Sequence, residues 1–196
     1  PKYIFEHDLG LWNFGATGVL KERKTGAQKL CKTVSKALVP DRGAALTRLR
    51  QLQNLKHPHL CAIYEVLEDG QNFFILTEKL RGGDIENWLN DIDESTHWLA
   101  EQTVAAYICQ ALVALAHCHS INAFHNDLKP NNVLLSSKLP DAVVMVSDMG
   151  LASILDPESR TLRRSPNPYA APELLAGSRR VAGGSADMWS IGAIAQ

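Results

Sequence analysis

The sequence lacks a long apolar run, a strong net charge and any pair of closely spaced cysteines. Its 20 lysines and arginines nearly balance its 21 aspartates and glutamates, for a formal net charge of -1. No overall field therefore favours binding to nucleic acid or to an anionic membrane. No apolar run approaches the roughly 20 residues that cross a bilayer, and the first residues lack the features of a signal peptide. We expect no membrane span and no nucleic-acid partner.

The four cysteines, at positions 31, 61, 109 and 118, are scattered and form no C-x-x-C pair. Such spacing favours reduced thiols in an intracellular protein over a disulfide framework, so we expect a cytoplasmic location. With 45% hydrophobic and 21% charged residues over 196 positions, the chain has an ordinary globular composition and can bury a substantial core.

The first half of the chain is rich in strand signals. Short apolar runs with glycine turns from Tyr3 to Val34 predict a strand meander. Leucines recur at every third position between Arg42 and Leu55, which predicts one amphipathic helix. Two further strands are expected at Leu60 to Leu67 and at Phe73 to Thr77.

The second half is richer in helix signals. Ala100 to Ser120 predicts a long, buried helix, and the apolar runs Val133 to Leu135 and Val143 to Val146 predict a hairpin. Polar, proline-containing sequence from Asp156 to Pro168 indicates a long loop. A strand-rich half followed by a helix-rich half predicts an α+β fold of two lobes, with a ligand cleft between them.

One short segment concentrates reactive side chains. Asp127, Lys129 and Asn132 lie within six residues, and a second acid, Asp148, follows the next strand and precedes Gly150. This order supplies a base, a cation and two metal ligands. Phosphoryl transfer needs such parts, because the protein contributes mainly positioning and neutralisation of the phosphate charge.

Four motifs in a fixed order carry a resemblance to a known family. They are His125 to Asn132, H-N-D-L-K-P-N-N; Asp148 to Gly150, D-M-G; Ala171 to Glu173, A-P-E; and Asp187 to Gly192, D-M-W-S-I-G. Over nearly the whole chain the sequence resembles the protein kinase family, which carries a catalytic loop, D-F-G, A-P-E and a helix anchoring the catalytic loop.

The resemblance implies a bilobal protein-kinase-like fold with a small β-rich N-lobe and a mainly helical C-lobe. Residues 1–80 would form the N-lobe and the start of the hinge. Residues 81–196 would form part of the C-lobe with the catalytic loop and the activation segment. The part is incomplete by this resemblance, since the family's lobe continues beyond the helix that begins near Asp187.

The resemblance also assigns catalytic and metal-binding roles. Asp127 would accept or orient the proton of the substrate hydroxyl, and Lys129 would neutralise charge on the γ-phosphate of ATP. A lysine at this position is typical of serine/threonine kinases. Asn132 and Asp148 would hold Mg²⁺, a hard cation that suits carboxylate and amide oxygens.

The implied ATP-binding residues are spread along the chain. Gly10 and Gly15 would belong to the phosphate loop, and Lys32 would bind the α- and β-phosphates. Glu78 to Leu80 would form the hinge that offers backbone groups to adenine. Asp84 has two equally weighted interpretations, a contact to ribose or to a basic substrate residue, and a helix cap.

Three stretches, Lys24 to Lys36, His57 to Leu67 and Leu76 to Ile85, look most like the calcium/calmodulin-dependent and calcium-dependent protein kinases. The chain contains no EF-hand loop of the form D-x-[DN]-x-[DN]-G. A calcium response would therefore require a regulatory or calcium-sensing partner domain outside this chain.

Four positions depart from the family pattern. Trp12 replaces a glycine of the phosphate loop, and Arg48 stands where a helix Glu should pair with Lys32. Asn126 replaces the catalytic-loop Arg that reads an activation-loop phosphate, and Pro166 replaces a threonine that helps to hold Asp127. We expect the helix carrying Arg48 to swing outward or to present a basic face to a phosphate, an acidic partner or solvent.

Two functions follow from these observations. The favoured hypothesis is an ATP-dependent serine/threonine protein kinase, weak or partner-activated, acting on a protein substrate. The alternative is a pseudokinase, a binding or scaffold module with little or no catalysis.

Overall fold

The computed structural model describes residues 1–12, 14–91, 101–139, 141–155, 167–176 and 183–196. The chain forms two compact units. The first contains the described residues of 1–56, 61–79 and 154–157, and the second contains those of 57–60, 80–153 and 158–196. The predicted loop from Asp156 to Pro168 lies almost entirely outside the described residues.

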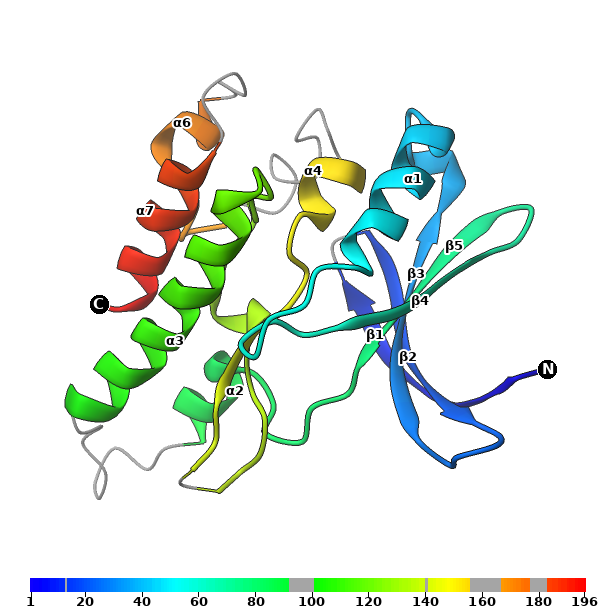
Figure 1. Ribbon diagram of the computed structural model, residues 1–196, viewed down its shortest axis with the longest axis horizontal. Coiled ribbons are helices and arrows are strands. Elements are labelled where there is room, and N and C mark those ends of the chain that lie inside the picture. Colours follow the sequence, from blue (N-terminus) through cyan, green and yellow to red (C-terminus); the bar gives the residue numbers. More distant parts are fainter. Residues whose placement is uncertain (13, 92–100, 140, 156–166, 177–182) are drawn as a thin grey trace. The chain divides into compact units, whose positions relative to one another are not determined.

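The first unit is built on a five-stranded antiparallel sheet (Figure 1). Its strand order is β1-β2-β3-β5-β4, so β5 lies between β3 and β4. The strands are β1 (Tyr3–Trp12), β2 (Gly15–Glu22), β3 (Gln28–Ser35), β4 (Ile63–Glu68) and β5 (Asn72–Glu78). The predicted meander is confirmed. The predicted strand from Leu60 begins later, at Ile63, because Leu60 instead bridges to Val146 in the second unit.

The hairpin of β1 and β2 depends on two glycines in different ways. Gly10 follows a register shift in β1 and has a φ of 99°, a left-handed conformation that favours glycine. Gly15 has no such φ, but a Cβ there would lie 2.0 Å from the carbonyl oxygen of Thr33 in β3. Gly15 therefore permits the close approach of β2 to β3.

We expect Gly15→Ala to destabilise the protein by about 1–3 kcal/mol, since the added methyl group must push β2 away from β3. Gly43→Ala is the matched control, because Gly43 lies in an exposed helical turn where alanine is favoured by about 0.5–1 kcal/mol. Urea unfolding followed by circular dichroism measures both. Equal stability of Gly15→Ala and the wild type would contradict the packing described here.

Helix α1 (Arg42–Leu52) covers one end of the sheet and packs against β4. The Asp41 side chain caps its first turn by accepting a hydrogen bond from Ala44 N, and Ala45 and Leu49 are its buried residues. A short 3₁₀ helix, Lys36–Leu38, precedes it. The predicted end at Leu55 is wrong. The carbonyl oxygens of Gln51 and Leu52 accept from Asn54 N and Leu55 N, three residues on, so the α-helical pattern gives way to turns after Leu52.

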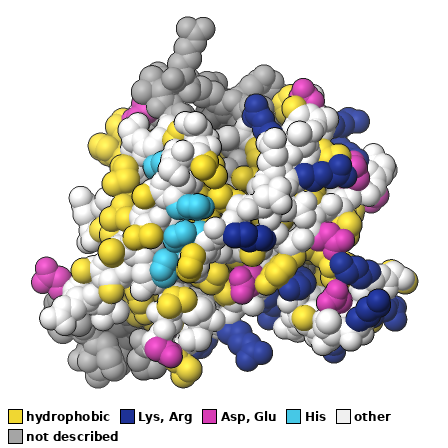
Figure 2. Space-filling model, in the orientation of Figure 1, with side chains coloured by type: hydrophobic (Ala, Val, Ile, Leu, Met, Phe, Trp, Pro, Cys, Tyr) yellow, Lys and Arg dark blue, Asp and Glu magenta, His cyan; other side chains and the backbone are white. Residues whose placement is uncertain are grey.

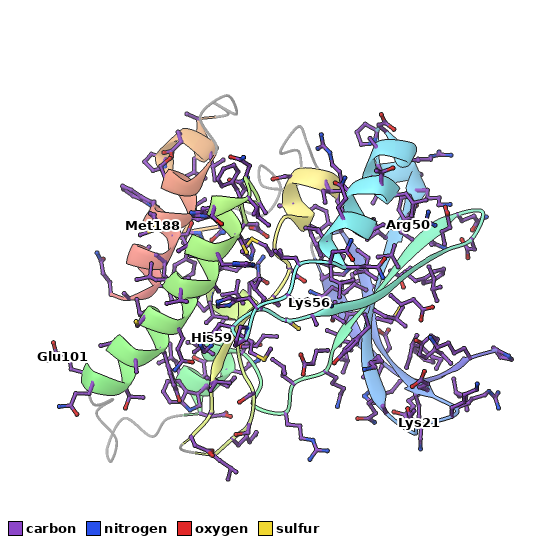
Figure 3. All side chains as sticks on the ribbon, viewed as in Figure 1. Lys21, Arg50, Lys56, His59, Glu101 and Met188 are labelled. Carbon is purple, nitrogen blue, oxygen red and sulfur yellow. The ribbon has the colours of Figure 1, made fainter. Side chains whose placement is uncertain are left out.

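The second unit contains helices and one small hairpin. Its helices are α2 (Ile85–Asn90), α3 (Glu101–Ser120), the 3₁₀ helix η2 (Pro130–Asn132), α4 (Leu151–Leu155, shared with the first unit), α6 (Pro172–Leu175) and α7 (Gly184–Ile194). The hairpin consists of β6 (Val133–Leu135) and β7 (Val144–Val146), close to its predicted bounds. Helices α3 and α7 lie side by side (Figure 1). Figure 3 labels Met188 on α7.

Helix α3 is less buried than the sequence predicts. Its fully buried residues, Ala111, Ala114, Leu115 and Cys118, all lie in its second half, and Val113 remains 48% exposed. Burial begins where the helix approaches α7, where His119 Nε2 donates to the Asp187 carboxylate at 2.8 Å. The prediction of a helix is confirmed, and the prediction that it is buried holds only for its second half.

Within the described ranges, α3 is the one helix long and apolar enough to cross a membrane. Core helices of soluble proteins satisfy the same criterion, so this is weak evidence for a span. The helix contacts β7 and α7, and its Gln110 accepts a hydrogen bond from Val144 N at 2.7 Å. These are the contacts of a helix inside a folded unit, and the absence of a membrane span stays a prediction.

Histidines gather on one face of the molecule (Figure 2). The His57 ring stacks on His117, with ring centroids 5.1 Å apart, and lies 5.7 Å from His59. His59, labelled in Figure 3, makes a 2.8 Å hydrogen bond from its Nδ1 to the carbonyl oxygen of Val144. Burial, together with the charges of His117 and His59, lowers the pKa of His57 from its ordinary 6.5.

The lowered pKa of His57 predicts a loss of stability in mild acid. The unfolded chain takes up a proton at His57 near pH 6.5, whereas the folded chain resists it, so stability falls as pH drops below about 6.5. His57 Nδ1 also accepts a hydrogen bond from His59 N at 3.1 Å, which needs an unprotonated nitrogen. We expect His57→Asn to flatten this pH dependence, since an Asn side chain still accepts from the amide two residues on. Urea midpoints between pH 7.5 and 5.5 measure it, and an unchanged slope would refute the assignment.

Candidate active site

The backbone at the start of the catalytic loop is held by the buried carboxylate of Asp187. Asp187, in the first turn of α7, is fully buried and accepts hydrogen bonds from the backbone N–H groups of His125 and Asn126, each at 2.8 Å. Its Oδ2 also lies 2.8 Å from His119 Nε2. Burial, with the Asp187 charge, raises the pKa of the nearby Cys118 thiol to about 11. Asp187 thus holds the loop in place, as the helix motif predicts.

The backbone at this anchor is in a conformation that few residues adopt. Asn126 has a φ of 61°, in the left-handed region, and Asn tolerates that region better than most residues. The His125 ring beside it is fully buried, with Nε2 2.9 Å from the carbonyl oxygen of Ser147 and Nδ1 accepting from Asp127 N at 3.3 Å. These bonds fix the His125 ring and tie it to the backbone of Asp127.

The Asp127 carboxylate is buried and held at both oxygens. Lys129 Nζ lies 3.3 Å from Oδ2, and Asn167 Nδ2 donates to Oδ1 at 3.2 Å. The same Asn167 amide lies 3.3 Å from the carbonyl oxygen of Leu128. A carboxylate fixed in this way, with an ammonium group beside it, has the geometry of a positioned base with a cation for an anionic substrate.

The chain segments that carry the two predicted metal ligands, Asn132 and Asp148, run side by side. Asn132 Nδ2 donates to the carbonyl oxygen of Asp127 at 2.9 Å, so the amide oxygen Oδ1 is the Asn132 atom that would bind a metal ion. The carbonyl oxygen of Asn132 accepts from Ser147 N at 2.9 Å, so the chain segment carrying Asp148 runs beside it. Asp148 has a φ of 61°, an unusual conformation for a residue other than glycine. A carboxylate and an amide oxygen suit a hard divalent cation such as Mg²⁺.

Asn126 makes a neutral contact with the segment after Asp148. Its Nδ2 donates to Ser153 Oγ at 2.9 Å, and its Oδ1 is buried with no hydrogen-bond partner in the described residues. Both side chains of this hydrogen bond are neutral. That Asn126 offers no cation to an activation-loop phosphate stays a prediction.

The first unit contains the predicted phosphate-binding residues. Lys32, on β3, is only 8% exposed, and its Nζ lies 4.8 Å from the centroid of the Trp12 ring at the end of β1. Gly10 and Gly15 lie on the same hairpin as Trp12, where Trp12 pairs with Gly15. Arg48 is exposed on α1, and Arg50 two residues further on lies 3.8 Å from Glu68 (Figure 3). Whether the Arg48 face meets a phosphate, an acidic partner or solvent stays a prediction.

The chain passes from the first unit to the second after Lys79, within the predicted hinge. Glu78 N donates to the carbonyl oxygen of Ala62 at 3.1 Å, and Thr77 before it is buried. Leu80 begins the second unit and is partly buried. The structure shows Asp84 as a helix cap, with its two oxygens accepting from the backbone and side chain of Asn87. A contact from Asp84 to ribose or substrate stays a prediction.

Sequence reasoning missed Asn167. It singled out Pro166, which lies outside the described residues, as the loss of a group that holds Asp127. The next residue supplies that group instead, through the 3.2 Å hydrogen bond from its amide. The available signal was a polar residue between two prolines close to A-P-E, which is too weak to assign a partner 40 positions away.

The comparisons with known proteins agree with the fold and with these motifs. The family model described as the protein kinase domain matches residues 3–196. The chain belongs to the protein kinase family.

Curated relatives are serine/threonine kinases of more than one kind. The chain is 31% identical to calcium-dependent protein kinase 22 of Arabidopsis thaliana over 98% of its length and 39% of that protein. It is 32% identical to calcium-dependent protein kinase 7 of Oryza sativa subsp. japonica, over 98% of its length and 35% of that protein. It is 36% identical to human serine/threonine-protein kinase D2 over 95% of its length and 21% of that protein. The chain therefore spans between about a fifth and two fifths of these relatives.

Proposed function

We propose that this chain is the catalytic part of a serine/threonine protein kinase that transfers the γ-phosphate of ATP to protein hydroxyl groups. The observation that carries the proposal is the Asp127 carboxylate, held at one oxygen by Lys129 and at the other by Asn167. A scaffold has no need for a buried carboxylate positioned at both oxygens, whereas a base must be held in place.

Each held residue has a role in the proposed reaction. Asp127 orients the substrate hydroxyl and takes up its proton, and Lys129 neutralises charge that develops on the transferred phosphoryl group. Asn132 and Asp148 would hold Mg²⁺, which supplies charge neutralisation at the phosphates when bound. Lys32 binds the α- and β-phosphates.

The proposed nucleotide contacts are taken from the family resemblance, and the proposed location from the cysteines. Glu78 and Leu80 would offer backbone groups to adenine, Asp84 would meet ribose or a basic substrate residue, and Gly10 and Gly15 would flank the phosphates. We propose a cytoplasmic protein, in keeping with its four free cysteines. A calcium-sensing partner domain is proposed from the two calcium-dependent relatives.

A pseudokinase is the second candidate, and one observation favours it. Lys32 Nζ lies 4.8 Å from the centroid of the Trp12 ring. The family has a small glycine in place of Trp12 in the phosphate loop. A binding module would keep the anchored loop and use it without transfer.

Transfer of radiolabelled phosphate from Mg-ATP to serine, threonine and tyrosine peptides with flanking basic residues tests the proposal. We expect labelling of serine or threonine, none of tyrosine, and dependence on Mg²⁺. Peptide labelling by the wild type that is no greater than labelling by Asp148→Asn would contradict the kinase proposal. Thermal stabilisation by ATP without any transfer would support the pseudokinase in its place; ATP at 100 times its dissociation constant stabilises a fold by about 2.7 kcal/mol.

A further inference from the structure

The Trp12 side chain contacts both a ring and a cation. Its indole makes an edge contact with Phe14, with centroids 5.0 Å apart at an angle of 73°. Lys32 Nζ lies 4.8 Å from the Trp12 centroid, within the range of a cation–π contact. Phe14 and Lys32 are both about nine-tenths buried. The indole is therefore fixed beside the ammonium group before any ligand binds.

The indole N–H has no partner in this arrangement. Trp12 Nε1 is buried, and no described atom accepts a hydrogen bond from it. Buried indole N–H groups usually find an acceptor, because a buried donor without one destabilises the folded state. An acceptor that arrives with a ligand would remove this cost.

The phosphate loop is poorly arranged to bind an anion through its backbone. Gly10 N already donates to Asp8 Oδ1 at 2.9 Å, so this amide faces a carboxylate of its own strand. Gly15 is needed for the close approach of β2 to β3. In the family pattern a glycine between these two lets a further backbone amide approach the phosphates. Trp12 stands at that position in this chain.

We propose that Trp12 Nε1 and Lys32 Nζ form a two-donor site for a phosphate group of the nucleotide, with the indole N–H replacing backbone amides of the glycine-rich loop. The inference rests on the proposed function for its ligand, a nucleoside triphosphate, but the two donors would recognise any polyphosphate. Trp12 is then a binding residue of the site and not an obstruction to it.

Isothermal titration of the purified protein with tripolyphosphate, ATP and adenosine tests the proposal. Trp12→Phe keeps an aromatic ring against Phe14 and Lys32 and removes the N–H donor. We expect it to weaken tripolyphosphate and ATP roughly tenfold, the usual effect of losing one hydrogen bond to a charged group, and to leave adenosine within about twofold. Trp189→Phe, at an indole 54% exposed on α7, is the matched control and should change nothing.

Unchanged or tighter binding of tripolyphosphate by Trp12→Phe would overturn the proposal, and so would a wild type that binds neither tripolyphosphate nor ATP. Equal adenosine affinity in the variant and the wild type shows that the variant is folded. The proposed function fails separately. A protein that binds tripolyphosphate through Trp12 but transfers no phosphate keeps this site and loses the kinase activity. A protein whose phosphate transfer and ATP affinity are unchanged by Trp12→Phe keeps the kinase activity and loses the proposed Trp12 site.

Discussion

Asp187→Ala is expected to abolish phosphotransfer and to destabilise the protein by about 3–5 kcal/mol. The substitution removes the acceptor of two backbone N–H groups, the buried one of His125 and the partly buried one of Asn126. It also removes the group that holds the left-handed backbone of Asn126. The catalytic loop would relax, and Asp127 would lose its position. Urea unfolding and a single-turnover transfer assay measure the two effects.

Asp141→Ala is the matched control for this substitution, because Asp141 is exposed in the turn between β6 and β7. It should change stability by less than about 0.5 kcal/mol. Asp187→Asn keeps one acceptor oxygen and should fall between the wild type and Asp187→Ala. A stable and active Asp187→Ala protein would show that the loop is anchored by other contacts.

Asn167→Asp is expected to reduce the transfer rate about a hundredfold or more with little change in ATP affinity. The new carboxylate would face Asp127 Oδ1 at the present 3.2 Å, where two unit charges repel by roughly 5 kcal/mol at an effective dielectric of 20. Asp127 would turn away from the substrate hydroxyl. The hydrogen bond to the carbonyl oxygen of Leu128 would be lost as well. Steady-state kinetics with separate kcat and KM for ATP detect this pattern.

The control is Asn54→Asp, at an exposed position after α1 in the first unit. It adds the same charge away from Asp127 and should leave kcat within about twofold. A fall in ATP affinity with unchanged kcat in Asn167→Asp would contradict a positioning role for Asn167 at Asp127.

The sequence predicts the parts of the fold that depend on local patterns. The strand meander, the Val133–Leu135 hairpin strand and the catalytic-loop spacing all appear, because period-two alternation and short motifs determine them over a few residues. The end of α1 moved from Leu55 to Leu52, since a few competing turn hydrogen bonds decide where a helix stops.

The missed features depend on contacts between distant residues. Asn167 meets Asp127 across 40 positions, and Lys32 meets Trp12 across two strands of the sheet. The incomplete burial of α3 depends on which elements pack on it, which periodicity alone does not show. The role of Asp84 could not be predicted, because an aspartate at this position can cap a helix or contact a ligand. The structure shows the cap.

The central claim is that Asp127 is a working catalytic base and not a remnant of one. Single-turnover transfer of the γ-phosphate from Mg-ATP to a serine peptide, by the wild type and by Asp127→Asn, tests it most directly. Asn keeps the shape of Asp127 and one of its two acceptor oxygens, so it can accept from Lys129 or from Asn167, but it has no charge and takes up no proton. We predict a wild-type rate at least about a hundredfold above that of Asp127→Asn, in the range typical of general base catalysis. Equal rates in the two proteins would contradict the claim.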